Sequence, residues 1–306
     1  MTSVQAPVSL SGVFLVDKPR GMTSHDVVAR MRRVLREKKI GHAGTLDPMA
    51  TGLLVVLVGE GTKLEPYLAK VDKTYEATLT FGRSTATFDA DGETTEERPL
   101  DASLLRDQGR LRAAFDVERA RAEQIPPAHS AIHVNGRRSY ELARKGIEVE
   151  LPARAVSIRA LSAPVVDVEA GTVHLTLTVT KGYYVRSFAR DVSLSLGTPL
   201  HLSFLRRTAC SALSIEHATA LAAPRELHIA GARTLTDALR HSGHSLITVD
   251  DETALRVQQG KPFALPLACA DVVGILHTSN LLAMAERRGD TFHVLRGFDP
   301  GAILRP

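Results

Sequence analysis

Alternation between apolar and polar residues marks two half-buried strands in this chain. The pattern runs from residue 74 to 81 and again from 173 to 179, and a period of two is typical of a strand with one face in the core. Residues 13–16 and 53–58 are instead continuously apolar, which predicts strands buried on both faces. The chain therefore contains at least one sheet with a well-covered core.

Helical spacing of apolar residues appears in two other places. Between residues 27 and 35 the apolar positions recur every three or four residues, which predicts an amphipathic helix. Thr23 followed by Asp26 has the spacing of a capping box and would begin this helix. A second helical pattern covers residues 185–196, and Gly197 is placed to end it.

Residues 41–52 lack any periodicity and contain four glycines or prolines, which predicts a loop directly before a buried strand. Strands and helices are interspersed without regular βαβ repetition, and this favours an α+β fold. From about residue 245 short apolar runs alternate with glycines, which predicts a small all-β module. We expect a polar tail over residues 1–11, one domain over 12–240 and a second over 245–306.

Charge adds a hint about the partner. Lys and Arg number 38 against 34 Asp and Glu, but residues 17–42 hold eight of the basic and only three of the acidic residues. A local basic face suits a polyanion such as RNA. A solvated helix surface is the ordinary alternative.

The two cysteines, Cys210 and Cys269, exclude a disulfide framework and any multi-cysteine metal site. The sequence shows neither a signal-peptide pattern nor an apolar run long enough for a membrane span. We therefore expect a soluble, cytoplasmic protein without a membrane partner. Asp89-Ala90-Asp91-Gly92 lacks the flanking ligands of a calcium loop and predicts a turn.

Polar residues remain at predicted strand ends and loops, and each alone has a structural explanation. An aspartate before proline, such as Asp47, is most often a turn-former. Taken together, the motifs around these residues closely resemble those of the TruB family of tRNA pseudouridine synthases. The motifs that carry the resemblance are Asp17-Lys18-Pro19-Arg20-Gly21-Met22-Thr23-Ser24, the stretch from Gly41 to Gly52, Lys73-Thr74-Tyr75, Gln124-Ile125-Pro126-Pro127, Ser130-Ala131, Asn135-Gly136-Arg137, Tyr140-Glu141-Leu142-Ala143-Arg144, Gly146, Lys181-Gly182-Tyr183-Tyr184-Val185-Arg186-Ser187 and Leu205-Arg206-Arg207-Thr208.

The resemblance implies a pseudouridine synthase fold with a central mixed sheet and an RNA-binding cleft, an RNA-gripping insertion at about residues 124–152 and a PUA-like, β-rich C-terminal domain. It implies conversion of the T-loop uridine of tRNA, position 55, to pseudouridine. That reaction exchanges an N1–C1′ bond for a C5–C1′ bond without net redox change, so neither cofactor nor metal is expected.

The resemblance also assigns three catalytic residues. Asp47 would act at the ribose, either as nucleophile or as base. Arg186 would orient this carboxylate and keep it ionised where water is excluded. Tyr75 would stack on the base and take the C5 proton, although its place on the apolar face of a strand also fits a core residue.

The remaining assignments concern RNA binding. The target uridine must leave the stacked T-loop, and His42 is similar to the family residue that fills the vacated space. Tyr184 and Leu205 would line the uracil pocket. The other substrate-binding and RNA-gripping candidates are Lys18, chiefly as support for its own loop, Lys73, Arg137 and Arg144.

Three positions depart from the family pattern, namely Ala43, His129 and His133, and we expect them to affect RNA grip rather than bond-making. The predicted partner is the T-stem-loop of tRNA, with the acceptor stem bound by the C-terminal domain, and no obligatory protein partner is expected. Two alternatives stay open. One is the catalytic subunit of an RNA-guided pseudouridine synthase, and the other is a tRNA-binding or remodelling protein in which catalysis is incidental.

Overall fold

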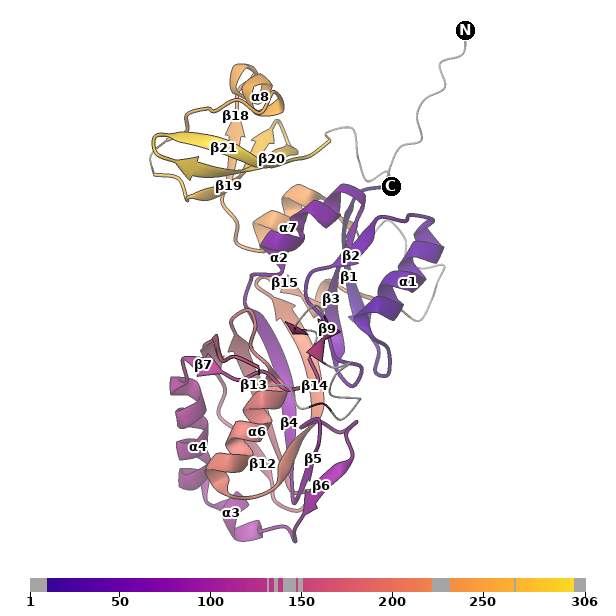
Figure 1. The fold of residues 1–306 in the computed structure, drawn as a ribbon, viewed down its shortest axis with the longest axis vertical. Coiled ribbons are helices and arrows are strands. Elements are labelled where there is room, and N and C mark those ends of the chain that lie inside the picture. The colour runs from indigo at the N-terminus through magenta and orange to yellow at the C-terminus, as the bar shows by residue number, and fades with distance from the viewer. Residues whose placement is uncertain are drawn as a thin grey trace. The chain divides into compact units, whose positions relative to one another are not determined.

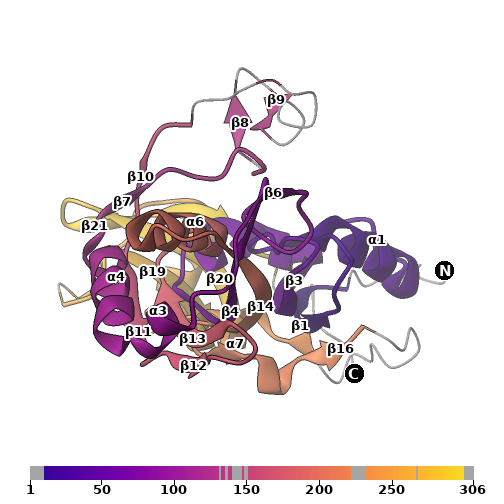
Figure 2. The same ribbon diagram turned by 90° about the horizontal axis from the view of Figure 1, so that it is seen from below.

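The computed structural model describes residues 10–130, 132–134, 137–139, 147, 151–221, 232–266 and 268–299. These residues form two compact units. Unit 1 combines the described residues up to 48, residues 52–71 and those from 209 onward, whereas unit 2 combines residues 49–51 with the described part of 72–208. Figures 1 and 2 show the elements of both units.

Unit 1 draws its elements from both ends of the sequence. Its helices and strands are β1 (Gly12–Lys18), α1 (Ser24–Leu35), β2 (Ile40–His42), β3 (Thr51–Val58), the 3-10 helix η1 (Gly59–Leu64), α2 (Glu65–Leu68), β15 (Leu213–Ser214), the 3-10 helix η2 (Ile215–His217), β16 (Thr219–Ala220), β17 (Ala232–Arg233), α7 (Leu235–His241), β18 (Leu246–Val249), α8 (Asp251–Gln258), β19 (Val272–His277), β20 (Asn280–Arg288) and β21 (Thr291–Gly297).

Strand β1 is the centre of the first sheet of unit 1. It runs antiparallel to β3, with Gly12 opposite Val58 and Lys18 opposite Gly52, and parallel to β16. Its successive residues Val13 to Val16 are all buried, so both faces of the strand are covered, as its continuous apolar run predicts. The sheet is therefore mixed, and the predicted α+β class with a mixed sheet is confirmed.

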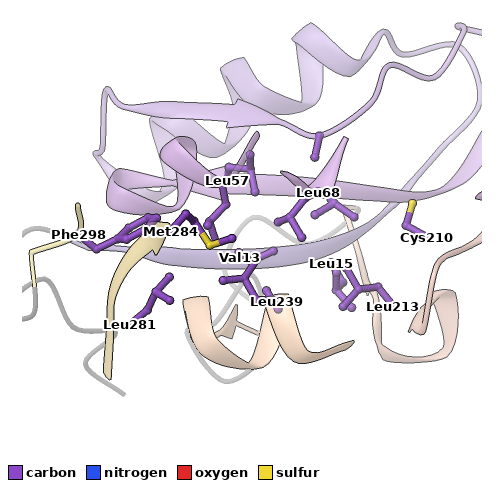
Figure 3. Close-up of a cluster of buried hydrophobic side chains, with 14 of the residues drawn as sticks. Val13, Leu15, Leu57, Leu68, Cys210, Leu213, Leu239, Leu281, Met284 and Phe298 are labelled. Carbon is purple, nitrogen blue, oxygen red and sulfur yellow. The ribbon is translucent and has the colours of Figure 1, made fainter. Parts of the chain in front are cut away.

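A single apolar cluster joins the N-terminal strands of unit 1 to its C-terminal part. Figure 3 shows Val13 and Leu15 of β1 beside Leu239 of α7, with Met284 and Phe298 in the same cluster. Val13 and Leu239 are completely buried, and burial of such a side chain contributes about 1.5–3 kcal/mol. The domain boundary predicted at residues 240–245 falls inside unit 1 and stays a prediction.

The C-terminal part of unit 1 is a four-stranded sheet in the order β18-β19-β20-β21, with helix α8 packed on β20 through a second apolar cluster. This helix makes the expectation of an all-β module wrong. Asp250 caps the helix by accepting a hydrogen bond from the Thr253 N–H at 2.8 Å, and Ala254 and Val257, three residues apart, supply its buried face. The β-rich character itself is confirmed.

Unit 2 contains a sheet in the order β11-β13-β4-β14, covered by two helices that lie side by side in Figure 1. Phe115 of α4 and Phe188 of α6 stack with ring centroids 5.9 Å apart. Its elements are β4 (Lys73–Phe81), β5 (Arg83–Thr85), β6 (Thr94–Glu97), α3 (Ala102–Arg106), α4 (Gln108–Ala120), β7 (Glu123–Gln124), β8 (His133–Val134), β9 (Arg137–Arg138), β10 (Arg154–Ala155), β11 (Ile158–Leu161), β12 (Val165–Asp167), β13 (Thr172–Val179), α6 (Val185–Leu196) and β14 (Leu200–Cys210).

Most local predictions are confirmed, including both alternating strands and both helices. Thr23 and Asp26 form the predicted capping box, and Gly197 ends α6 in the left-handed region with φ of 66°. The loop predicted over residues 41–52 is shorter than expected, because β2 extends to His42 and β3 begins at Thr51. Within the described ranges, no helix is long and apolar enough to cross a membrane.

Candidate functional site

The Asp47 loop, residues 43–48, belongs to unit 1 and forms most of the connection between β2 and β3. Gly44 and Gly52 on either side of Asp47 have φ values of 108° and 98°, which residues with a Cβ rarely adopt. The neighbouring Leu46 is buried, whereas Asp47 is only half-buried. The loop thus anchors one apolar side chain and leaves the following carboxylate partly accessible.

Residues 18–24 tether this loop from the side. Ser24 is almost completely buried, and its hydroxyl accepts a hydrogen bond from the Leu46 N–H at 2.8 Å and donates one to the Leu46 carbonyl at 3.2 Å. The Gly21 N–H donates to the Pro48 carbonyl at 2.8 Å. The two residues that flank Asp47, Leu46 and Pro48, are therefore held by residues that lie more than 20 positions earlier in the sequence.

Lys18 is fully buried and supports the same region. Its Nζ donates to the carbonyl oxygens of Met22 at 2.7 Å, Pro19 at 3.0 Å and Pro48 at 3.4 Å. Carbonyl acceptors of this kind compensate for taking an ammonium group out of water. These contacts agree with the expectation that Lys18 supports its own loop.

His42 is the last residue of β2 and lies opposite Val56 of β3. Its side chain is half-buried, and the next residue, Ala43, donates its N–H to the Val55 carbonyl at 2.9 Å. Strand pairing therefore fixes the backbone of His42 up to the point where the Asp47 loop begins. Ala43 itself is completely buried, so this departure from the family pattern lies in the core.

The candidate base-binding residues Tyr75, Lys73 and Leu205 lie on two neighbouring strands of unit 2. Tyr75 and Lys73 belong to β4, with exposed fractions of 9% and 7%. Leu205 belongs to β14 and is also buried. The Thr208 hydroxyl donates to the Thr74 carbonyl at 3.4 Å and so links these strands beside Tyr75.

Arg186 lies in the first turn of α6 and is 4% exposed. Its guanidinium donates to the His129 carbonyl at 2.8 Å and to the Thr87 carbonyl at 3.4 Å. Its Nε lies 3.5 Å from Oδ2 of Asp89. Two segments of unit 2 therefore hold the guanidinium in a fixed orientation, while Tyr184, two residues earlier, is half-buried at the N-cap of the helix.

Asp89 contacts Arg186, although the sequence predicted only a turn at this position. The turn is present, since the Gly92 N–H donates to the Asp89 carbonyl at 3.3 Å. Its Oδ1 also accepts hydrogen bonds from the Thr87 hydroxyl at 2.6 Å and the Asp91 N–H at 3.1 Å. A turn motif gives no sign that the second carboxylate oxygen meets an arginine from a distant helix, so the sequence alone could not indicate this ion pair.

The candidate RNA-gripping residues are described less completely. Arg137 belongs to strand β9, which pairs with β8 so that His133 lies opposite Arg138. Arg144 lies outside the described residues. Figure 2 shows the paired strands β7 and β10, and the separate pair β8 and β9.

The predicted basic side of α1 is present near its C-terminal end, where Arg32, Arg33, Arg36 and Lys38 are exposed. Arg32 also donates to the Ile40 carbonyl at 2.8 Å, and Arg36 ends the helix in the left-handed region with φ of 52°. Cations near a helix C-terminus interact favourably with its dipole. Some of these basic side chains therefore stabilise the helix, whether or not they also bind RNA.

Comparison with known proteins gives one family match. The family described as TruB family pseudouridylate synthase, N-terminal domain, matches residues 32–185. A protein named tRNA pseudouridine synthase B from Thermobifida fusca is 46% identical over 221 residues, covering 69% of this chain and 73% of the relative. A protein of the same name from Caulobacter vibrioides is 42% identical over 307 residues, covering 95% of this chain and 96% of the relative.

Two solved structures are similar in fold. A Cbf5-Nop10-Gar1 complex contains a chain with a TM-score of 0.70 and 21% identity, covering 96% of this chain and 87% of that one. An H/ACA RNP bound to a substrate RNA containing 2′-deoxyuridine contains a chain with a TM-score of 0.67, the same identity and the same coverage. At this identity the similarity concerns the fold alone.

Proposed function

The chain belongs to the TruB family of pseudouridylate synthases, and from this premise we propose that it isomerises the T-loop uridine of tRNA, position 55, to pseudouridine. Membership confirms the resemblance predicted from the motifs and makes the chain an isomerase that forms pseudouridine. The choice of tRNA as substrate follows the names of the relatives.

The chemistry sets requirements for the site. The N1–C1′ bond of uridine breaks, the base turns, C5 bonds to C1′, and the proton lost from C5 is balanced by one gained at N1. The substrate supplies every heavy atom of the product, so the protein has to supply a carboxylate at the ribose, a group that takes the C5 proton and a pocket that holds the detached base.

The observation that carries the proposal is the tethered Asp47 loop. Leu46 and Pro48, on either side of Asp47, are hydrogen-bonded to Ser24 and Gly21, while the carboxylate itself stays partly accessible. A reacting group on a backbone fixed in this way does not have to be ordered when substrate binds. Asp47 then acts at C1′ or on a ribose proton.

The other catalytic roles are part of the proposal. Arg186 orients the Asp47 carboxylate and keeps it ionised, which its buried and multiply hydrogen-bonded guanidinium supports. Tyr75 stacks on the uracil and takes the C5 proton. Its 9% exposed fraction leaves little of the ring at the surface, so a purely structural role in the core is the competing explanation.

RNA binding follows the same assignment. The uridine turns out of the T-loop at a cost of about a few kcal/mol in stacking, and His42 occupies the vacated space. Tyr184, Leu205 and Lys73 bind the uracil and its nucleotide. Arg137 and Arg144 grip the stem, and the C-terminal domain binds the acceptor stem.

We propose that the enzyme works in the cytoplasm without a guide RNA or an obligatory protein partner. Support comes from the 42–46% identity to proteins named tRNA pseudouridine synthase B. The chains from the H/ACA particle and the Cbf5 complex share only 21% identity. The guided alternative therefore rests on fold similarity alone.

The test uses purified protein and an unmodified tRNA transcript labelled with tritium at C5 of uridine. Pseudouridine formation releases the tritium, and a transcript with cytidine at position 55 identifies the site. We expect release from the first transcript and none from the second. The Asp47→Asn variant should bind tRNA with unchanged affinity and release no tritium. A folded, tRNA-binding wild-type protein that releases none without a guide would refute the proposal.

A further inference from the structure

The N-terminus of α6, which carries Arg186, is capped by a residue from another segment. The N-cap residue Tyr184 makes no capping bond with its own side chain. Its backbone N–H donates instead to Oε1 of Gln124 at 2.9 Å. In a capping box a glutamate or glutamine at the third helical position accepts this bond, but here that position is Ser187.

Ser187 makes a second hydrogen bond between α6 and the segment that contains Gln124. Its hydroxyl donates to the Ile125 carbonyl at 2.9 Å, and one turn later Arg190 donates to the same oxygen at 3.1 Å. Gln124 therefore accepts the N-cap N–H that a local capping box would otherwise satisfy, and the Ile125 carbonyl binds two side chains from the first two turns of α6. Gln124 is only 2% exposed, which leaves it little surface for contact with RNA.

The segment that follows Gln124 is stiff and leads to Arg186. Pro126 and Pro127 have restricted φ angles and hold Ile125 in an extended conformation. The chain then reaches His129, whose carbonyl accepts the 2.8 Å hydrogen bond from the Arg186 guanidinium. One end of this segment thus holds the backbone of the first helical turn, and the other end holds the side chain of Arg186.

An ion pair between Arg121 and Asp191 joins this segment to α6. Glu118 at the end of α4 is fully buried and accepts two hydrogen bonds from Arg121, at 2.7 and 2.8 Å. Asp191 of α6 pairs with Arg190 at 2.7 Å and lies 3.7 Å from Arg121. Burial, followed by the charges of Glu118 and Asp191, raises the pKa of Tyr183, so its phenol stays neutral beside them. Sliding of α6 past residues 121–125 would separate Arg121 from the largely buried Asp191 carboxylate, and a buried charge that loses a partner is unfavourable.

We propose that Gln124 is a positioning residue that aligns Arg186 with the reacting carboxylate, rather than an RNA-gripping residue of the insertion in which it lies. The inference rests on the proposed function, in which Arg186 orients Asp47. Gln124 lies at the start of the insertion, and this proposal gives it a role in the bond-making step instead of in RNA binding.

Two substitutions of Gln124 distinguish the effect of its hydrogen-bond acceptor from the effect of its side-chain volume. Gln124→Met keeps the length of the side chain but removes the oxygen that accepts the Tyr184 N–H, whereas Gln124→Glu keeps an oxygen in the same place. Under single-turnover conditions with saturating enzyme, we expect Gln124→Met to slow pseudouridine formation on the order of ten- to hundredfold, the penalty for a small misplacement of a catalytic group. Its dissociation constant for tRNA should stay within about twofold of wild type.

Gln124→Glu should recover most of the rate. Glu123→Met provides a matched control, because Glu123 is the exposed neighbour on the same two-residue strand, and it should leave the rate unchanged. If Gln124→Met does not fold, Ser187→Ala decides the question, since it removes the bond to the Ile125 carbonyl and should also slow the reaction at constant tRNA affinity.

Three results would overturn the inference: a wild-type rate in Gln124→Met or in the deciding Ser187→Ala variant, a rate loss matched by an equal loss of tRNA affinity, or a Gln124→Glu variant as slow as Gln124→Met. These results require an active wild-type enzyme. An inactive wild-type protein would refute the proposed function itself and, with it, this role for Gln124.

Discussion

Replacing Ser24 by alanine would remove both hydrogen bonds that hold Leu46 next to Asp47. The hydroxyl accepts from the Leu46 N–H at 2.8 Å and donates to its carbonyl at 3.2 Å, and Ser24 is 2% exposed. Water therefore cannot readily replace it. A buried backbone donor without a partner costs about 1–3 kcal/mol, whereas alanine at the first position of α1 costs no helix propensity. We expect the free energy of unfolding to fall by about 1–3 kcal/mol.

The same substitution should affect turnover, because Leu46 precedes Asp47 directly. A loop that shifts by a fraction of an ångström misaligns the carboxylate, and we expect kcat to fall about tenfold with little change in tRNA affinity. Urea denaturation measures the first effect and tritium release measures the second.

Ser242→Ala is the matched control for Ser24→Ala. Ser242 is also buried, donates to the Leu239 carbonyl at 2.8 Å and lies 2.8 Å from Nδ1 of His244. It belongs to unit 1 but makes no bond to the Asp47 loop. Its loss should lower stability by a similar amount and leave kcat unchanged. If Ser24→Ala lowers kcat no more than Ser242→Ala does, the tether has no role in catalysis.

Two other outcomes are expected. Tyr75→Phe keeps the ring but removes the phenol, so tritium release should fall on the order of 10²–10⁴-fold while tRNA binding persists; full activity would make Tyr75 a core residue. Burial lowers the pKa of His201, which donates from Nδ1 to the Arg83 carbonyl at 2.9 Å. Since the unfolded chain then binds more protons, the free energy of unfolding should decrease as pH falls below the ordinary pKa of histidine, about 6.5. His201→Gln should flatten this dependence in urea titrations at a series of pH values, and an unchanged slope would contradict the assignment.

Local signals in the sequence predicted the elements around the site well. The capping box of Thr23 and Asp26 and the apolar run of β3 depend only on neighbouring residues, so their elements were predictable without tertiary information. Helix α8 was missed because it is short, and its two buried residues, Ala254 and Val257, give a weak periodic signal among strands.

The supporting residues of the candidate site were harder to predict. Ser24 and Gln124 both occur in motifs that resemble the family, but the motifs do not say what each side chain contacts. Their partners Leu46 and Tyr184 lie 22 and 60 residues away, and such pairs depend on how the whole sheet and its helices assemble. A pattern within one segment contains no information about that assembly.

The apolar cluster of unit 1 cannot form completely until most of the chain has been synthesised. Leu15 belongs to the first strand, but it packs in one cluster with Leu239 and Phe298, which leave the ribosome much later. At about 5–20 residues per second the delay is on the order of tens of seconds. During that interval the strand that leads into residues 18–24 has no complete core, and on a nascent chain it is a natural target for chaperones. Translation that stops before α7 would yield a polypeptide that contains Asp47 together with Lys18, Gly21 and Ser24, yet lacks part of the apolar cluster that covers β1.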